Sequence, residues 1–291
     1  MSKHSLFYGD NLTILQEHVS DESINLIYID PPFNTGKYQL RTEIQVEQDD
    51  EGDRVGFQGK TYKTYKGETR HYSDKFESSN VYLKFLRPRF EEAYRVLHPY
   101  GSFFLHIDYR EAHYCKIILD EIFGRESFIN EIIWAYDYGG RSKSRWPTKH
   151  DNILWYAKTP KRYTFNYEEM DRIPYMAPGL VGKEKAARGK TPTDVWWHTI
   201  VSTSGHEKTG YPTQKPLGIL NRIVKVHSSP DDMLLDFFAG SGTFGESAAL
   251  HNRSSILIDS NIAAIHTIMS RLRIFGVDLV NANYETLASN S

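Results

Sequence analysis

The chain has 291 residues, of which 40% are hydrophobic, and this is enough for one large α/β domain with insertions. Its formal net charge of −2 excludes a bulk polycation, and its single cysteine excludes both an internal disulfide framework and a four-cysteine zinc site. No apolar stretch approaches the roughly 18–20 residues of a membrane span.

The first residues, 1–5, are polar and do not form a secretory signal peptide, so we expect a cytoplasmic protein. Gly9, Asp10 and Asn11 follow, ahead of a segment in which Leu12 and Leu15 share one helical face. Asp10 is therefore expected to cap a helix over residues 11–18.

Residues 24–29 are β-branched, aliphatic or aromatic apart from one asparagine, and they predict a buried parallel strand. Asp30, Pro31, Pro32 and Phe33 follow it directly. Two successive prolines fix φ and remove two backbone donors, which predicts a rigid turn at the carboxyl edge of a sheet. A carboxylate, free carbonyls and an aromatic face suit a planar molecule with an amino group, such as a nucleobase. The alternative is an ordinary loop in which Asp30 only caps a helix.

Residues 37–80 are polar and lack sustained apolar periodicity, which predicts a mobile insertion loop directly after the proline turn. The next segments predict a helix over 83–97, a strand over 101–108 and a helix over 111–123. Cys115 falls within the second helix, where a packing role fits better than a nucleophilic one.

Two further strands are expected at 129–134 and 152–157, and basic residues gather between them and beyond. The basic side chains surround Trp146, Trp155 and Tyr163, an interleaving that suits phosphate contact and base stacking. The alternative is a solvated loop beside a buried strand. The residues concerned are Arg141, Lys143, Arg145, Lys149, Lys158, Lys161 and Arg162.

Residues 233–238 predict another buried strand, which leads into Ala239, Gly240, Ser241, Gly242 and Thr243 and then a helix over 244–250. A tight glycine turn between strand and helix is typical of nucleotide binding, because the glycines allow close approach to a ligand. The spacing fits neither the dinucleotide fingerprint nor a P-loop.

The strand over 254–259 ends in Asp259, about 20 residues after the glycine turn, where such folds place a ribose-binding carboxylate. Asp236, at the end of its own strand, would face a cationic group of the ligand. An adenosine with a charged amino acid tail and no phosphate is S-adenosylmethionine. The alternatives are that Asp259 caps the helix that follows and that the turn is purely structural.

Alternating strands and helices predict an α/β fold with a doubly wound, mostly parallel sheet, whose ligands bind at the carboxyl ends of the strands. Asp30 and Asp236 would then lie on one edge. His106 and Asp108 end another strand, where we expect packing and capping roles.

Three separated motifs now resemble one family. Residues 30–33, residues 211–216 (Tyr-Pro-Thr-Gln-Lys-Pro) and the Phe238-x-Gly240-x-Gly242 pattern match, in this order, the β-class amino-methyltransferases of DNA. Tyr211 stands where that family has His. Gly9 to Asn11 look like the family's opening element, whose acid lies near the cofactor.

This resemblance implies a Rossmann-like S-adenosylmethionine-dependent methyltransferase fold and methyl transfer to an exocyclic amino group, by base flipping and direct in-line displacement. It implies Asp30, Pro31, Pro32 and Phe33 as catalytic residues. From the basic cluster described above, Arg141, Lys143, Arg145 and Lys149 are expected to bind DNA. The cofactor-binding residues would be Asp10, Asp30, Lys215, Asp236, Phe238, Ala239, Gly240, Ser241, Gly242, Thr243 and Asp259.

Residues 1–160 and 211–291 are expected to form one catalytic and cofactor-binding domain, with 37–80 inserted and 161–210 as a target-recognition region. The Asp at position 30 favours adenine, since cytosine-modifying relatives often carry Ser there. Cytosine, RNA, a protein glutamine amide, and a silent DNA-recognition subunit remain alternatives. Expected partners are double-stranded DNA, a second copy of the chain, and a cognate restriction endonuclease.

Overall fold

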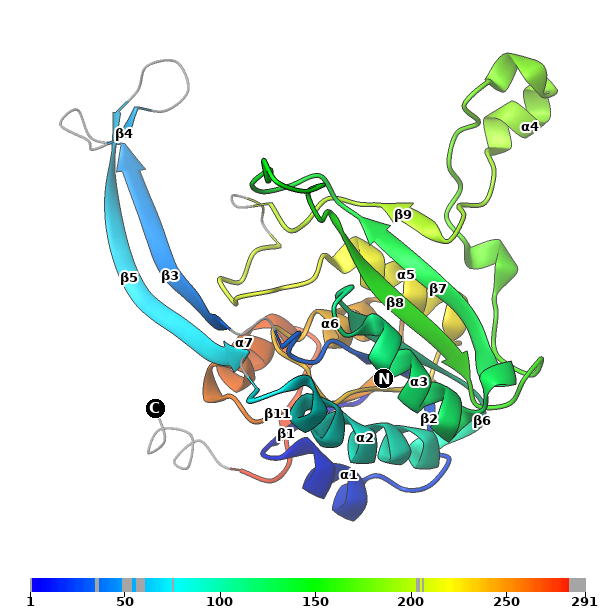
Figure 1. The fold of residues 1–291 in the computed structure, drawn as a ribbon, viewed down its shortest axis with the longest axis horizontal. Coiled ribbons are helices and arrows are strands. Elements are labelled where there is room, and N and C mark those ends of the chain that lie inside the picture. The colour runs from blue at the N-terminus through cyan, green and yellow to red at the C-terminus, as the bar shows by residue number, and fades with distance from the viewer. Residues whose placement is uncertain are drawn as a thin grey trace.

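The computed structural model describes residues 2–34, 37–48, 54–55, 61–74, 76–202, 205 and 207–282. Within these ranges nine strands form one sheet in the order β12-β1-β11-β10-β2-β6-β8-β7-β9 (Figure 1). The strands are β1 (His4–Tyr8), β2 (Ile24–Ile29), β6 (Leu97–Ile107), β7 (Phe128–Ala135), β8 (His150–Ala157), β9 (Val195–Trp197), β10 (Met233–Asp236), β11 (Ser254–Asp259) and β12 (Asp278–Leu279).

The six strands from β12 to β6 are all parallel, which confirms the predicted doubly wound, mostly parallel sheet. β8 is antiparallel to β6, β7 is antiparallel to β8, and β9 is parallel to β7. Because β8 runs in reverse, its first residues lie beside the last residues of β6. The connection from β7 to β8 therefore emerges at the carboxyl edge of the parallel strands.

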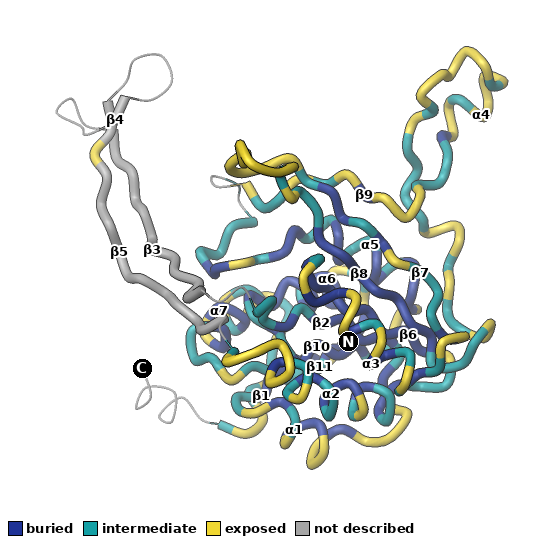
Figure 2. The backbone as a smooth tube through the Cα atoms, in the orientation of Figure 1, coloured by how far each residue is buried: buried dark blue, intermediate teal, exposed yellow. Residues whose placement is uncertain are grey.

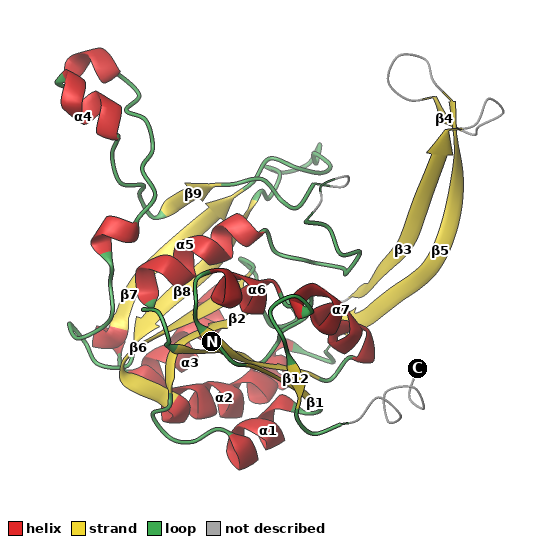
Figure 3. Ribbon diagram, turned by 180° about the vertical axis from the view of Figure 1, so that it is seen from behind, coloured by secondary structure: helices red, strands yellow, loops and turns green. Residues whose placement is uncertain are grey.

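Helices cover both faces of this sheet, as the front and back views show (Figures 1 and 3). One face carries α1 (Asn11–His18), α2 (Ser79–Val96) and α3 (Ala112–Phe123). The other carries α5 (Leu217–His227), α6 (Thr243–Leu250) and α7 (Ile262–Leu272).

The buried residues gather in the central strands and in the helices that cover them (Figure 2). They form three hydrophobic clusters, of which the two larger lie on opposite faces of the sheet. In β2, Ile27 and Ile29 pack with residues of α1, α2 and α3, whereas Leu26 and Tyr28 pack with residues of α5 and α6. Successive strand side chains point to opposite faces, so a strand covered on both sides needs a continuous apolar run. This explains why residues 24–29 could be identified as a strand.

Two local predictions are confirmed. The Asp10 carboxylate accepts the Thr13 amide at 3.1 Å and so caps α1 at the position expected from the sequence. Cys115 is fully buried on the inner face of α3, and burial raises the pKa of its thiol. A buried thiol of this kind is a packing residue.

The stretch from 37 to 80 differs from the expected irregular loop. β3 (Lys37–Gln48) and β5 (Thr61–Asp74) pair as a long antiparallel ribbon, to which β4 (Arg54–Val55) adds a short strand. This ribbon extends away from the main sheet (Figure 1). Its sequence alternates polar residues with Tyr38, Leu40, Ile44 and Val46, a period of two that a search for long apolar runs misses.

Residues 161–210 contain short elements only: the 3-10 turns Tyr167–Glu169 and Pro178–Leu180, helix α4 (Lys183–Arg188) and β9. α4 stands apart from the rest of the molecule (Figure 1). A third 3-10 turn, Arg125–Ser127, precedes β7. Among the described residues, no helix combines the length and apolarity needed to cross a bilayer.

Candidate active site

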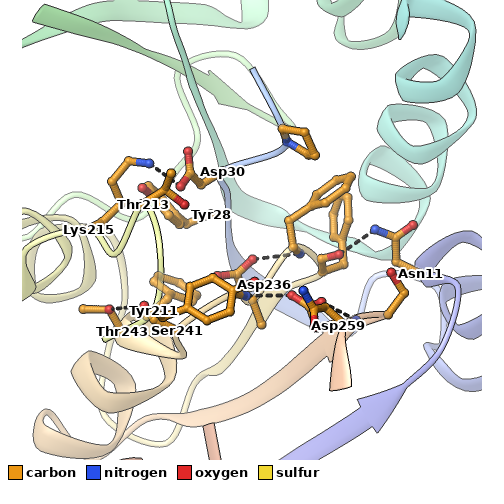
Figure 4. A pocket seen from close by; sticks show the side chains of 18 of the residues that line it. Asn11, Tyr28, Asp30, Tyr211, Thr213, Lys215, Asp236, Ser241, Thr243 and Asp259 are labelled. Carbon is orange, nitrogen blue, oxygen red and sulfur yellow. Dashed lines mark hydrogen bonds and ion pairs between the residues drawn. The ribbon is translucent and has the colours of Figure 1, made fainter. Parts of the chain in front are cut away.

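The proline turn and the glycine turn, some two hundred residues apart in sequence, meet at the carboxyl edge of the sheet. β2 and β10 are neighbours, with Leu26 opposite Leu234 and Ile27 opposite Leu235. Asp30 follows the end of β2, and Asp236 is the last residue of β10. Both carboxylates and Gly240 line a single cavity of about 320 Å³ (Figure 4).

Asp30 has one engaged and one free carboxylate oxygen. Its Oδ2 forms an ion pair with the Lys215 ammonium, which is almost fully buried (Figure 4). Its Oδ1 is buried and has no hydrogen-bond partner among the residues that the structure describes. A buried acceptor without a donor is costly, so this oxygen is suited to a ligand that brings an N–H group.

Several contacts hold the proline turn in place. The Tyr82 hydroxyl donates to the Pro32 carbonyl at 2.6 Å. Asn34 has a left-handed backbone, with φ of +53°, and its side-chain amide donates to the Glu111 carboxylate at 2.9 Å. Phe33 stacks on the His106 ring with 6.0 Å between centroids. The turn is thus tied to α2, to the start of α3 and to the end of β6.

The glycine turn depends on left-handed backbone. Gly240 has φ of +50° and donates its amide to the Asp259 carboxylate at 2.8 Å. A Cβ at Gly240 would lie 3.4 Å from the Tyr211 ring, which also lines the cavity. Gly242, with φ of +74°, begins α6, and a Cβ there would come within 2.9 Å of Ile268 on α7. Glycine is required for both reasons at position 242.

The cavity gathers carboxylates whose charges are unfavourable without a cation. Burial, followed by the charges of Asp30 and Asp259, raises the pKa of Asp236 well above its ordinary range, although it accepts the Phe238 amide. Burial also raises the pKa of Asp259 to about 6, although it accepts the Asn261 and Gly240 amides. With the rings of Tyr211, Phe238 and Phe244, these acceptor carboxylates fit an adenosine that carries a sulfonium and an ammonium.

Arg89 is a cavity residue that the sequence did not reveal. Its guanidinium donates to the Asp10 carboxylate at 2.7 Å and to the Asn11 side-chain oxygen at 2.6 Å. Asn11 in turn donates to the Phe237 carbonyl at 2.6 Å, beside the glycine turn. Asp10 therefore caps α1 and also lines the cavity, where Arg89 of α2 orients its carboxylate.

A buried hydrogen-bonded chain runs beneath the proline turn. The Tyr28 hydroxyl, which lines the cavity, lies 2.7 Å from His106 Nδ1, and His106 Nε2 lies 3.2 Å from Asp151. The Tyr136 hydroxyl donates to the same Asp151 carboxylate at 3.1 Å. His106 is buried, as expected for a packing residue, but it also links β2 to β8. Asp108 accepts the Arg110 amide at 3.0 Å in the turn before α3. The N-cap residue of α3 is Glu111, which contradicts the predicted capping role of Asp108.

Most residues proposed from the sequence lie together. Those that line the cavity are Asp10, Asp30, Pro32, Lys215, Asp236, Phe238, Ala239, Gly240, Ser241, Thr243 and Asp259. Pro31, Phe33 and Gly242 lie beside the cavity lining without belonging to it. Lining residues not proposed from the sequence include Asn11, Tyr28, Phe85, Arg89, Tyr211 and Thr213. Tyr211 and Thr213 belong to the motif at 211–216, which could have indicated them.

The basic cluster divides into two groups at opposite edges. The connection between β7 and β8 carries Arg141, Lys143, Arg145 and Lys149 at the carboxyl edge. Lys158 follows the other end of β8, where its amide donates to the Gly101 carbonyl, and Trp155 is buried in the core. The prediction that the cations surround Trp146, Trp155 and Tyr163 as stacking partners is wrong for Trp155, which is buried, and the eight-residue strand β8 separates the two groups of cations.

Comparison with known proteins identifies relatives over most of the chain. The family described as DNA methylase matches residues 24–270. The type II methyltransferase M.HpaI of Haemophilus parainfluenzae is 30% identical over 256 residues, which are 88% of this chain and 70% of that protein. The DNA adenine methyltransferase YhdJ of Escherichia coli K12 is 27% identical over 92% of this chain and 82% of that protein.

Solved structures share the fold. The crystal structure of the M1.HpyAVI–SAM complex superimposes with a TM-score of 0.58 at 21% identity, and the match covers 92% of this chain and 98% of that one. At this level of identity the likeness concerns the arrangement of the sheet and its helices.

Proposed function

The chain belongs to the DNA methylase family, and from this premise we propose that it transfers a methyl group from S-adenosylmethionine to the exocyclic amino group of adenine in double-stranded DNA. Its relatives M.HpaI and YhdJ are named as a type II methyltransferase and a DNA adenine methyltransferase, which supports this choice. The aspartate at position 30 favours adenine over cytosine.

The unpaired Oδ1 atom of Asp30 is the observation that carries the proposal. This oxygen is buried in the cavity that the glycine turn also lines, while Lys215 holds the other oxygen. An aromatic amine is a weak nucleophile because its lone pair is delocalised into the ring. A fixed acceptor for one amino hydrogen localises that lone pair and stabilises the charge that develops on nitrogen. Pro31 offers its carbonyl for the second hydrogen.

The remaining cavity residues would hold the cofactor. Asp259 would accept the ribose hydroxyls, Gly240 would leave room for the adenosine, and Asp10 and Asp236 would face its cationic groups. Bound there, S-adenosylmethionine supplies an electrophilic methyl group on a sulfonium. The chain's own part is positioning, since holding two reacting atoms about 3–3.5 Å apart can lower the barrier by several kcal/mol.

An adenine paired inside a duplex cannot reach this cavity, so the base must be everted, at a cost of a few kcal/mol. Phe33, beside the cavity, would stack on the everted ring. The ribbon of β3 and β5 and the 161–210 region would contact the duplex on either side. We further propose that the protein is cytoplasmic, that it forms a homodimer and that it acts together with a cognate restriction endonuclease.

Nucleoside mass spectrometry of DNA treated with the protein and S-adenosylmethionine tests the proposed chemistry. We expect N6-methyladenine in duplex DNA and none when the cofactor is omitted. N4-methylcytosine would refute the assignment of the base, and methylation of RNA alone would refute the assignment of the substrate. DNA without any modified base, from protein that binds the cofactor, would indicate a silent subunit.

A further inference from the structure

The connection between β7 and β8, residues 136–149, is fixed against the active-site cavity. Its two ends are joined by the Tyr136 amide, which donates to the Lys149 carbonyl at 2.9 Å. The Tyr136 hydroxyl then reaches Asp151, and the chain continues through His106 to the Tyr28 hydroxyl in the cavity. These bonds connect the two ends of the loop to the residues that lie beneath the proline turn.

Internal bonds also shape the loop itself. The Lys149 ammonium donates to the carbonyls of Tyr138 and Gly140, and Arg141 pairs with Asp137 at 2.8 Å. Two of the four cations proposed for DNA are therefore engaged within the loop. Lys143 and Arg145 are exposed and form no ion pair with any residue that the structure describes. These two remain available for phosphate groups.

Trp146 follows Arg145 and is 93% exposed. A side chain that contacts its own chain so little does not stabilise the fold. An indole inserted between bases, in contrast, contributes about 1–3 kcal/mol of stacking free energy per base. That is the size of the penalty for removing one base from the helical stack. Apolar side chains that enter a base step are a known means of stabilising distorted duplexes.

We propose that Trp146 enters the duplex at the position that the everted adenine leaves, while Lys143 and Arg145 hold the flanking phosphates. This inference rests on the proposed function and adds to it the residue that stabilises the open duplex. Trp146 is a positioning residue, because it acts on the vacated base step and the methyl transfer takes place at Asp30.

Measuring kcat/KM for Trp146→Ala on three substrates tests the inference. On duplex DNA with a normal A·T target pair we expect kcat/KM of Trp146→Ala to fall roughly 10–100-fold, which corresponds to the free energy of one stacking contact. On duplex DNA in which the target adenine faces an abasic site, and on single-stranded DNA, we expect rates within about threefold of wild type, because eversion is then easy. Trp146→Phe should retain most activity on all three substrates.

An exposed ring at the opposite edge of the sheet provides the control. Tyr100→Ala should match wild type on every substrate, since Tyr100 lies beside Gly101 at the far end of β6. A second readout is the fluorescence of 2-aminopurine at the target position, which should rise with wild-type protein and rise much less with Trp146→Ala.

Equal losses for Trp146→Ala on all three substrates, or no loss on the paired duplex, would overturn the inference while leaving the proposed function intact. Wild-type protein that methylates none of the substrates would overturn the function itself, and the role of Trp146 with it.

Discussion

At the scale of single residues, Lys215 holds the carboxylate of Asp30, the residue that we propose to be catalytic. Its ammonium pairs with one oxygen of Asp30 and lies 4.9 Å from the centre of the Phe33 ring. The sequence placed Lys215 among the cofactor ligands, because the motif at 211–216 precedes the cofactor strand. Only the folded chain shows its proximity to Asp30, since the two residues lie 185 positions apart.

Lys215→Met should therefore reduce the rate of methyl transfer by about 100-fold, the size expected when a catalytic group shifts by about 1 Å. Affinity for S-adenosylmethionine should stay within about twofold of wild type. Single-turnover kinetics and calorimetry measure the two quantities, with the exposed Lys3→Met as control. If Lys215→Met lowered the affinity for S-adenosylmethionine and left the rate of methyl transfer unchanged, Lys215 would be a cofactor ligand and would not orient Asp30.

Asp259 makes cofactor binding depend on pH. Because its pKa is raised to about 6, the carboxylate is charged above pH 6 and becomes neutral as the pH falls through that value. A neutral carboxyl group accepts hydrogen bonds from the ribose hydroxyls more weakly than a carboxylate does. We expect affinity for S-adenosylmethionine to fall about fivefold between pH 7.5 and 5, which corresponds to an interaction of about 1 kcal/mol.

Calorimetry across this pH range measures the effect, and circular dichroism at each pH verifies the fold. Asp259→Asn should bind more weakly at pH 7.5 and lose the part of the pH dependence that Asp259 contributes, with any remainder due to Asp236. The same slope in wild type and Asp259→Asn would show that another group titrates.

At the scale of elements, Arg89 joins α2 to the start of α1 and so to the glycine turn. It is buried and donates to Asp10, Asn11 and the Phe85 carbonyl. Arg89→Met should lower the free energy of unfolding by about 1.5–3 kcal/mol, the range for hydrogen bonds that involve a charged group. Arg87, on the same helix, forms an exposed pair with Glu121, so Arg87→Met should cost less than about 1 kcal/mol.

Urea denaturation of both variants checks this prediction. Equal effects at the two positions would mean that the buried contacts of Arg89 contribute no more than an exposed ion pair does.

The elements that could be predicted are those with a simple apolar pattern. β2, β7, β8 and β11 are short apolar runs, and α1 has a clear amino-terminal cap. The ribbon of β3 and β5 was missed because its alternation is carried by tyrosine, threonine and isolated aliphatic residues. β12 has two residues and depends on its neighbour β1, so local sequence could not indicate it.

At the scale of the whole molecule, the net charge is only −2, but the basic residues are unevenly distributed between the two edges of the sheet. The loop between β7 and β8 carries four cations at the carboxyl edge, where the cavity also opens, while Lys158 and Arg162 lie at the opposite edge. If the loop cations bind DNA as proposed, the duplex approaches at the carboxyl edge. The prediction from the sequence that Asp30 and Asp236 lie on the same edge is confirmed, because the carboxyl ends of parallel strands meet at one edge of a sheet.

DNA affinity should therefore fall steeply with salt concentration, as a straight line of log K against log salt. Arg145→Ala should reduce the slope of that line by about one, whereas Arg162→Ala should leave it unchanged. Fluorescence anisotropy at several salt concentrations measures both slopes. A flat response in wild type would contradict electrostatic binding at this edge.

The central claim is that the proline turn and the glycine turn form one site, in which Asp30 acts on the base and the glycine turn holds the cofactor. The most direct test measures both functions in one variant, Asp30→Ala. We predict an affinity for S-adenosylmethionine within about twofold of wild type, together with a single-turnover rate reduced by at least about 10²–10³-fold. Methyl transfer at near the wild-type rate would contradict the claim.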